Sequence, residues 1–157
     1  MVSEHPFADG GHAFCDYLST PGGRLRSRLL QLRLETLLGP ATVPARVLDV
    51  GCGTGELGLA FCRRGSALTL VDPAAPMLDI ARRNAAGAGV STPPRFLSLS
   101  LQELPQSLPP RSFDLVICHC LLEYLPDAEA ALAILSGLVA PGGHLSLSVL
   151  NGCQEVL

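Results

Sequence analysis

The sequence has no long apolar run and only a small share of charged residues. A membrane-spanning helix needs about 18 or more consecutive apolar residues, and the chain contains no such run. Residues 1–6 have neither the basic nor the apolar region of a secretory signal peptide. Charged residues make up 16% of the 157 residues and apolar residues 48%, which indicates a folded globular domain. We therefore expect a cytoplasmic protein that has no membrane span.

The cysteines do not form a metal-binding pattern. Six cysteines occur, and none has the C-x-x-C spacing that is typical of zinc or redox sites. Cys118, His119 and Cys120 are adjacent, but neighbouring side chains of a strand point to opposite faces and cannot converge on one ion. We predict reduced thiols and no metal. The net charge of −3 also argues against strong non-specific binding of nucleic acid, although it leaves room for a local basic patch.

The most informative stretch is residues 46–58. It begins with a short apolar run that predicts a buried parallel strand. Three glycines at alternate positions then break the strand, at Gly51, Gly53 and Gly55, and a helical pattern resumes at Leu57. Glycines let the backbone approach a ligand closely, and the N-terminus of the following helix presents free N–H groups. The order of strand, glycine turn and helix therefore indicates a binding loop.

The residues around this loop narrow the choice of ligand. A dinucleotide-binding loop reads G-x-G-x-x-G, whereas here the third glycine comes one place early and Glu56 follows it. A P-loop needs a Gly-Lys-Ser/Thr ending, which is absent. Glu56 would repel a pyrophosphate, and Asp49 adds a second carboxylate nearby. The loop therefore favours a ligand that has a cationic or zwitterionic portion.

Residues 47–55, Val-Leu-Asp-Val-Gly-Cys-Gly-Thr-Gly, resemble the signature loop of class I S-adenosylmethionine-dependent methyltransferases. The resemblance implies the cofactor S-adenosyl-L-methionine and a Rossmann-like α/β fold. Such a fold is a doubly wound, mostly parallel sheet of strand order 3-2-1-4-5. It divides the chain into an N-terminal helical segment, residues 1–40, and a cofactor-binding core, residues 41–157. It also implies that the loop binds the cofactor through Asp49, Gly51, Cys52, Gly53 and Gly55.

Hydrophobic periodicity places the expected elements along the chain. Strands are predicted at residues 46–50, 67–71, 95–99, 113–119 and 144–150. Helices are predicted at residues 24–38, 57–64, 76–86 and 127–139, with a short helix or lid at 7–18. Asp72 ends the second strand about 20 positions beyond the first glycine, where an acidic residue recognises ribose hydroxyls. Pro73 follows it, so Asp72 also suits a helix N-cap, and both roles can hold.

Two further stretches are similar to the bacterial tRNA 5-carboxymethoxyuridine methyltransferase family: residues 17–26 and residues 119–124. This resemblance implies that Arg26 and His119 contact the cofactor, and a guanidinium suits the methionine carboxylate because it can bind in a bidentate fashion. It also implies that Leu101 and Gln102 contact the adenine. The superfamily often has an acidic residue at the position of Ser100, which is missing here. For Arg24, Arg28 and Arg33 we expect a solvated basic face.

The resemblance implies methyl transfer, and the acceptor stays open. It is either the carboxylate of a modified wobble uridine in tRNA or a small molecule. No catalytic base is evident, and a carboxylate acceptor needs none. A non-catalytic cofactor-binding module and a nicotinamide-dependent oxidoreductase are the alternatives, the latter disfavoured by Gly55 and Glu56. Class I methyltransferases normally continue beyond a fifth strand, so we expect a C-terminally truncated chain whose exposed fifth-strand edge favours self-association.

Overall fold

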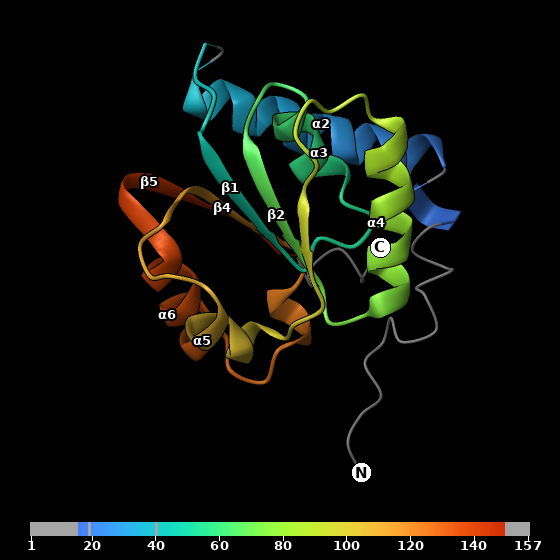
Figure 1. Ribbon diagram of the computed structural model, residues 1–157. Coiled ribbons are helices and arrows are strands. Elements are labelled where there is room, and N and C mark those ends of the chain that lie inside the picture. The colour runs from blue at the N-terminus through green and yellow to red at the C-terminus, as the bar shows by residue number, and fades with distance from the viewer. Residues whose placement is uncertain (1–15, 19, 40, 150–157) are drawn as a thin grey trace.

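The computed structural model describes residues 16–18, 20–39 and 41–149 (Figure 1). In this part of the chain five strands form one parallel sheet of order β3-β2-β1-β4-β5. The strands are β1 (Arg46–Val50), β2 (Ala67–Val71), β3 (Arg95–Leu97), β4 (Phe113–His119) and β5 (Val139–Ser148). The predicted fold class and strand order are confirmed.

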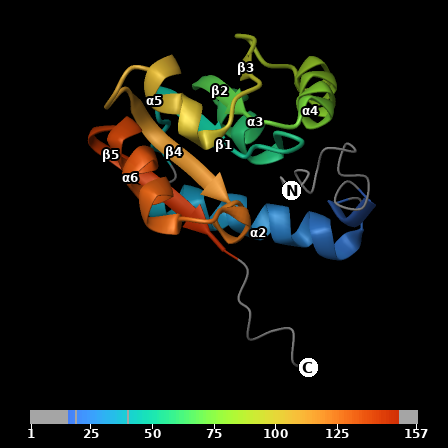
Figure 2. The ribbon, with the colours of Figure 1, turned by 90° about the horizontal axis from the view of Figure 1, so that it is seen from below.

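Helices cover both faces of the sheet (Figures 1 and 2). One face carries α2 (Pro21–Leu38), α3 (Glu56–Cys62) and α4 (Ala75–Gly87), and the other carries α5 (Leu104–Ser107) and α6 (Ala128–Leu138). Alternation along β1 explains the two layers. Val47 packs with Phe61 of α3, whereas its neighbour Leu48 packs with Leu135 of α6, and all four side chains are fully buried. No helix within the described ranges is long and apolar enough to cross a lipid bilayer.

The N-terminal helix α2 begins three residues earlier than predicted. Thr20 caps it, because its hydroxyl accepts a hydrogen bond of 3.1 Å from the Gly23 N–H. Pro21 occupies the first helical position, where its missing N–H and fixed φ suit a helix start. Residues 16–18 are helical, whereas the rest of the helix predicted at residues 7–18 lies outside the described residues.

The fifth strand departs most from the prediction. It begins at Val139 and not at residue 144, and α6 correspondingly ends at Leu138. The sequence Pro-Gly-Gly at residues 141–143, which is typical of a turn, instead lies within the strand, where its pairing with β4 is irregular. Gly142 has φ +77°, and a Cβ on Gly143 would lie 3.0 Å from backbone oxygens of β4. These glycines therefore let the strand bulge rather than end.

The chain between β3 and β4 is also more regular than predicted. β3 ends at Leu97, two residues earlier than expected, and a short 3₁₀ turn, η1 (Leu101–Glu103), precedes α5. A capping box fixes this turn, since the Glu103 carboxylate accepts hydrogen bonds from the Ser100 N–H and hydroxyl at 2.8 and 2.6 Å. A second 3₁₀ turn, η2 (Leu122–Tyr124), follows β4.

Candidate functional site

The glycine loop joins β1 to α3 at the carboxyl end of the sheet. Gly51, Gly53 and Gly55 all have positive φ, at 67°, 53° and 78°. The N–H groups of Gly51 and Cys52 both donate to the Val71 carbonyl of β2, at 2.9 and 3.0 Å. A Cβ on Gly51 would lie 3.1 Å from the Leu121 side chain, so space as well as backbone conformation favours glycine here.

Two buried carboxylates hold the loop from below. Asp49 is 4% exposed, and its Oδ2 accepts a hydrogen bond of 3.1 Å from the Gly58 N–H. Asp72 is 6% exposed and accepts from the N–H groups of Gly53 and Ala74, both at 2.9 Å. Burial raises the pKa of Asp49 to about 7, with a smaller contribution from Asp72 and an opposing one from the Gly58 N–H. Asp49 therefore titrates close to neutral pH.

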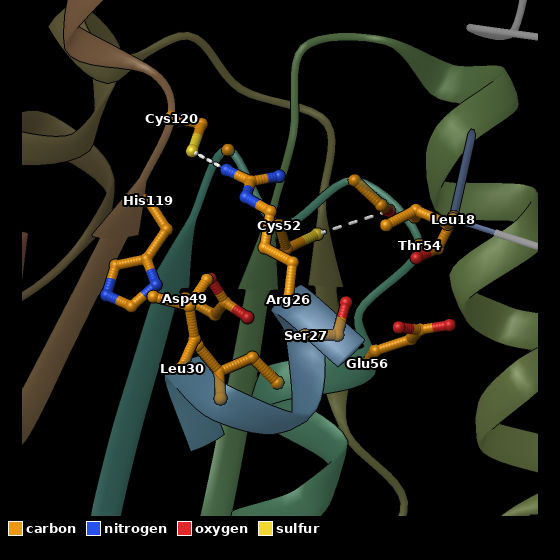
Figure 3. A pocket seen from close by; sticks show the side chains of 13 residues that line it. Leu18, Arg26, Ser27, Leu30, Asp49, Cys52, Thr54, Glu56, His119 and Cys120 are labelled. Atoms are coloured by element: carbon orange, nitrogen blue, oxygen red, sulfur yellow. Dashed lines mark hydrogen bonds between the residues drawn. The ribbon is translucent and has the colours of Figure 1, made fainter. Parts of the chain in front are cut away.

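A cavity of about 100 Å³ lies beside the glycine loop, and Asp49 is part of its lining (Figure 3). The first turns of α2, the glycine loop and the end of β4 enclose it. Its lining includes six of the residues predicted to bind a cofactor: Arg26, Asp49, Gly51, Cys52, Gly53 and His119. Sites for whole drug-sized ligands span roughly 300–1,000 Å³. This cavity therefore suits one end of a larger ligand.

The other four predicted residues do not line this cavity as the structure describes it. Gly55 is the N-cap of α3, and a Cβ built on it would lie 3.2 Å from the Leu70 side chain and 3.3 Å from that of Ala81, which leaves little room for a side chain. Asp72 lies beneath the loop, at the end of β2. Leu101 is 4% exposed within the core, whereas Gln102 beside it is exposed. These last three residues follow β2 and β3, and their contact with the adenosine part of a cofactor stays a prediction.

Arg26 reaches the cavity from α2 and His119 reaches it from the end of β4 (Figure 3). Arg26 of α2 donates a hydrogen bond from Nη2 to Sγ of Cys120. His119 ends β4, and its Nε2 lies 2.9 Å from the Ser146 hydroxyl, whereas its buried Nδ1 has no partner among the described residues. Burial, together with the nearby Arg26 guanidinium, lowers the pKa of His119 to about 4. The imidazole is therefore neutral at physiological pH.

Several residues that line the cavity were not predicted from the sequence. Leu30 lies one helical turn after Arg26, so helical spacing alone would have placed it beside the site. Cys120 has an unusual φ of +54° and donates its N–H to the Ser148 carbonyl, at 2.7 Å. No local sequence signal predicts that conformation, because it depends on the pairing of β4 with β5.

The cavity fits the amino-acid end of S-adenosyl-L-methionine. Nδ1 of His119 is a buried ring nitrogen that has no hydrogen-bond partner within the described residues. The Arg26 guanidinium beside it can bind a carboxylate in a bidentate fashion. Asp49 and Glu56 lie in the same lining and supply carboxylates for the cationic groups of such a ligand. In the described part of the chain, no three His, Cys, Asp or Glu side chains are grouped to hold a metal ion.

Comparison with known proteins gives a consistent family. A family model described as "Methyltransferase domain" matches residues 47–143, which is more than half of the chain. The ubiquinone biosynthesis O-methyltransferase of Xanthomonas euvesicatoria is 40% identical over 107 residues, covering 68% of this chain and 44% of the relative. The tRNA 5-carboxymethoxyuridine methyltransferase of Escherichia coli K12 is 34% identical over 135 residues, covering 84% and 51%. The chain spans about half the length of these curated relatives.

Solved structures agree on the fold. Magnesium protoporphyrin IX methyltransferase from Synechocystis, solved with bound S-adenosylmethionine, superposes with a TM-score of 0.71 at 21% identity, covering 85% of this chain and 68% of that one. An S-adenosylmethionine-dependent methyltransferase structure from Methanococcus maripaludis gives a TM-score of 0.75 at 16% identity, covering 94% and 65%. At such identities the likeness establishes the fold alone. Together with the family match, it shows that the chain belongs to the methyltransferase domain family, within the class I S-adenosylmethionine-dependent methyltransferases.

Proposed function

We propose that this chain binds S-adenosyl-L-methionine at the glycine loop and directs its methyl group to an anionic acceptor. The single observation that carries the proposal is the cavity in which Arg26, His119 and the loop converge. When bound, the cofactor supplies a methyl group that the acceptor takes by in-line displacement. The chain's contribution is alignment and exclusion of water, and alignment alone can lower a barrier by roughly 7–11 kcal/mol.

The residues have distinct roles in this proposal. Arg26 and Nδ1 of His119 hold the cofactor carboxylate between two elements that are far apart in sequence. Glu56 and Asp49 offset the positive charge of the ammonium and sulfonium groups. Asp72 keeps the loop in its binding conformation through the Gly53 N–H, and we assign the recognition of a ribose hydroxyl to the same carboxylate.

We propose the carboxylate of a modified wobble uridine in tRNA as the acceptor. The first support is the weakness of the bases in the cavity. The pKa of His119 is about 4, since it is buried and near Arg26, so it is a poor base at neutral pH. Asp49 also lines the cavity, but in this proposal its 4% exposed carboxylate faces the cationic groups of the cofactor and does not act as the base. A hydroxyl acceptor must lose a proton, whereas a carboxylate acceptor is already ionised and needs no base.

The second support is a groove that continues from the cavity. Arg24 and Arg28 of α2 and Arg63, which follows α3, line a groove of about 270 Å³. The groove and the cavity share Ser27, Glu56 and Leu57, so the two spaces adjoin. Arg24 and Arg28 are exposed, as predicted for a solvated face, yet here they are grouped with a third cation. Guanidinium groups bind phosphates in a bidentate fashion, which suits an RNA backbone.

Methyl transfer tests the proposal directly. Label from S-[methyl-³H]adenosylmethionine should enter a tRNA that carries 5-carboxymethoxyuridine, and should not enter the same tRNA without the carboxylate. The double variant Arg28→Glu/Arg63→Glu should weaken tRNA binding and reduce the salt dependence of the binding constant. Arg95→Glu lies outside the groove and is the matched control.

Three outcomes would contradict parts of this proposal. Transfer to phenolic small molecules but not to tRNA would favour the small-molecule reading. Equal tRNA binding by the groove variant and the control would show that the groove does not bind tRNA. Cofactor binding without transfer to any acceptor would favour a non-catalytic module.

A further inference from the structure

Ser146 lies beside the site on the last strand of the sheet. The pairing of β4 with β5 sets Ser146 opposite Ile117 and Ser148 opposite His119. Ile117 and His119 are two positions apart and point to the same face of the sheet. The Ser146 hydroxyl thus reaches the imidazole from the neighbouring strand, and its Oγ lies 2.9 Å from Nε2.

The contact with Ser146 matters because the His119 ring is neutral and can hold its proton on either nitrogen. A neutral imidazole carries one N–H donor and one acceptor nitrogen. Only two arrangements therefore fit the contact. Either Ser146 donates to Nε2 and the proton sits on Nδ1, or Nε2 donates to Ser146 and Nδ1 is an acceptor. The contact with Ser146 thus decides which kind of group His119 presents at its other nitrogen.

The surroundings of Nδ1 favour one of the two arrangements. Nδ1 is buried and has no partner within the described ranges, and leaving a buried polar atom unsatisfied is unfavourable. It belongs to a side chain that shares the cavity lining with Arg26. A carboxylate held by that guanidinium can accept a hydrogen bond from an Nδ1–H, whereas an Nδ1 lone pair would repel it. A donor at Nδ1 thus completes the carboxylate site.

We propose that Ser146 is a positioning residue that donates to Nε2 of His119 and so keeps the proton on Nδ1, facing the carboxylate of the cofactor. This inference rests on the proposed cofactor site and adds a residue to it. Ser146 itself touches neither cofactor nor acceptor in this account. It acts by fixing the orientation and tautomer of the ring.

The test reads the tautomer without any cofactor. Long-range ¹H–¹⁵N correlation spectra of histidine-labelled protein distinguish Nδ1–H from Nε2–H, and loss of the signal in His119→Asn assigns it. Wild type and Ser146→Thr, which keeps the hydroxyl, should show the Nδ1–H form at neutral pH. Ser146→Ala should show a mixture or the Nε2–H form. An Nε2–H form in the wild type, or an unchanged tautomer in Ser146→Ala, would overturn the inference.

Cofactor binding is the second arm. Ser146→Ala should weaken S-adenosylmethionine binding about two- to tenfold, as expected for one lost hydrogen bond, and Ser146→Thr should restore it. Ser136→Ala on α6 is the control for a serine remote from the site. An unchanged affinity in Ser146→Ala would also overturn the inference. If the wild type does not bind the cofactor, the proposed function fails, while the spectra still decide the tautomer.

Discussion

At the scale of single residues, the first loop glycine combines two constraints. Gly51 has φ +67°, and a Cβ there would lie 3.1 Å from the Leu121 side chain. Gly89 has a similar φ of +65° but no neighbour within 4 Å of a built Cβ. We predict that Gly89→Ala loses only about 1–2 kcal/mol, from the left-handed backbone, and that Gly51→Ala loses more and also weakens cofactor binding.

Urea unfolding and calorimetric titration of both variants measure these effects. Equal losses of stability would show that the Leu121 side chain can move aside for a Cβ on Gly51 without a further loss of stability. Unchanged cofactor affinity in Gly51→Ala would show that the loop tolerates a side chain at its closest approach.

Asp49 makes stability depend on pH in an unusual direction. Its pKa rises from an ordinary value of 3.8 to about 7 in the folded protein, mainly through burial. Folding therefore favours the protonated form, so its contribution is greatest below about pH 4 and is lost as the pH rises through 7. His119 acts oppositely, because its pKa falls from 6.5 to about 4, so that its contribution grows as the pH rises through that window.

The variant Asp49→Asn isolates the first effect. Its amide oxygen can still accept from the Gly58 N–H, but it does not ionise. We predict that Asp49→Asn gains stability relative to the wild type as the pH rises from 5 to 8 in urea titrations. A difference that stays constant with pH would contradict a raised pKa at Asp49.

The site residues that the sequence predicted are those with local signatures. Gly51 and Gly53 follow from a turn pattern, and Arg26 and His119 from resemblance to a family. Cys120 and Ser146 could not be found in this way. Their contacts depend on which residues of β4 and β5 lie side by side, and that register is a property of the folded sheet.

At the scale of elements, α2 connects stability to the site, since it carries Arg26. Its cap, Thr20, accepts from the Gly23 N–H and donates to the Tyr17 carbonyl at 2.6 Å. We predict that Thr20→Ala costs about 1 kcal/mol of stability and weakens cofactor binding. Thr36→Ala in the same helix should have little effect, because the exposed Thr36 hydroxyl donates to the Leu32 carbonyl within the helix and does not cap its end. If thermal unfolding shows equal losses of stability in Thr20→Ala and Thr36→Ala, the helix cap at Thr20 makes no special contribution.

The elements that sequence predicted well are the buried strands. β1, β2 and β4 match their predicted bounds because each is an apolar run that is buried on both faces. The predicted start of β5 is wrong because Pro-Gly-Gly is typical of a turn, whereas here Gly142 and Gly143 form a bulge within the strand. The short turns η1 and η2 escaped prediction, since three residues carry too little periodicity.

At the scale of the whole molecule, β5 forms one edge of the sheet in the described part of the chain. Leu147 of β5 is 40% exposed and Val149 after it is 57% exposed. We predict that the 157-residue chain self-associates through this edge. Leu147→Lys should lower the association constant in sedimentation velocity experiments.

A second apolar surface provides the comparison. Leu25 and Leu29 on α2 are 59% and 55% exposed. If the chains associate through the β5 edge, Leu25→Lys should leave the association constant unchanged. Loss of association in Leu25→Lys but not in Leu147→Lys would show that α2, and not the β5 edge, forms the interface.

We predict that the cavity beside the glycine loop holds the amino-acid end of S-adenosyl-L-methionine. Isothermal calorimetry with this cofactor and its demethylated product tests it most directly, with a nicotinamide dinucleotide as the control ligand. Arg33→Ala on the same helix is the control for Arg26→Ala. We predict that the wild type and Arg33→Ala bind both sulfur compounds and not the dinucleotide, and that Arg26→Ala binds them at least tenfold more weakly, since a hydrogen bond to a charged group contributes about 1.5–3 kcal/mol. Equal binding by Arg26→Ala, or binding of the dinucleotide instead, would contradict the account.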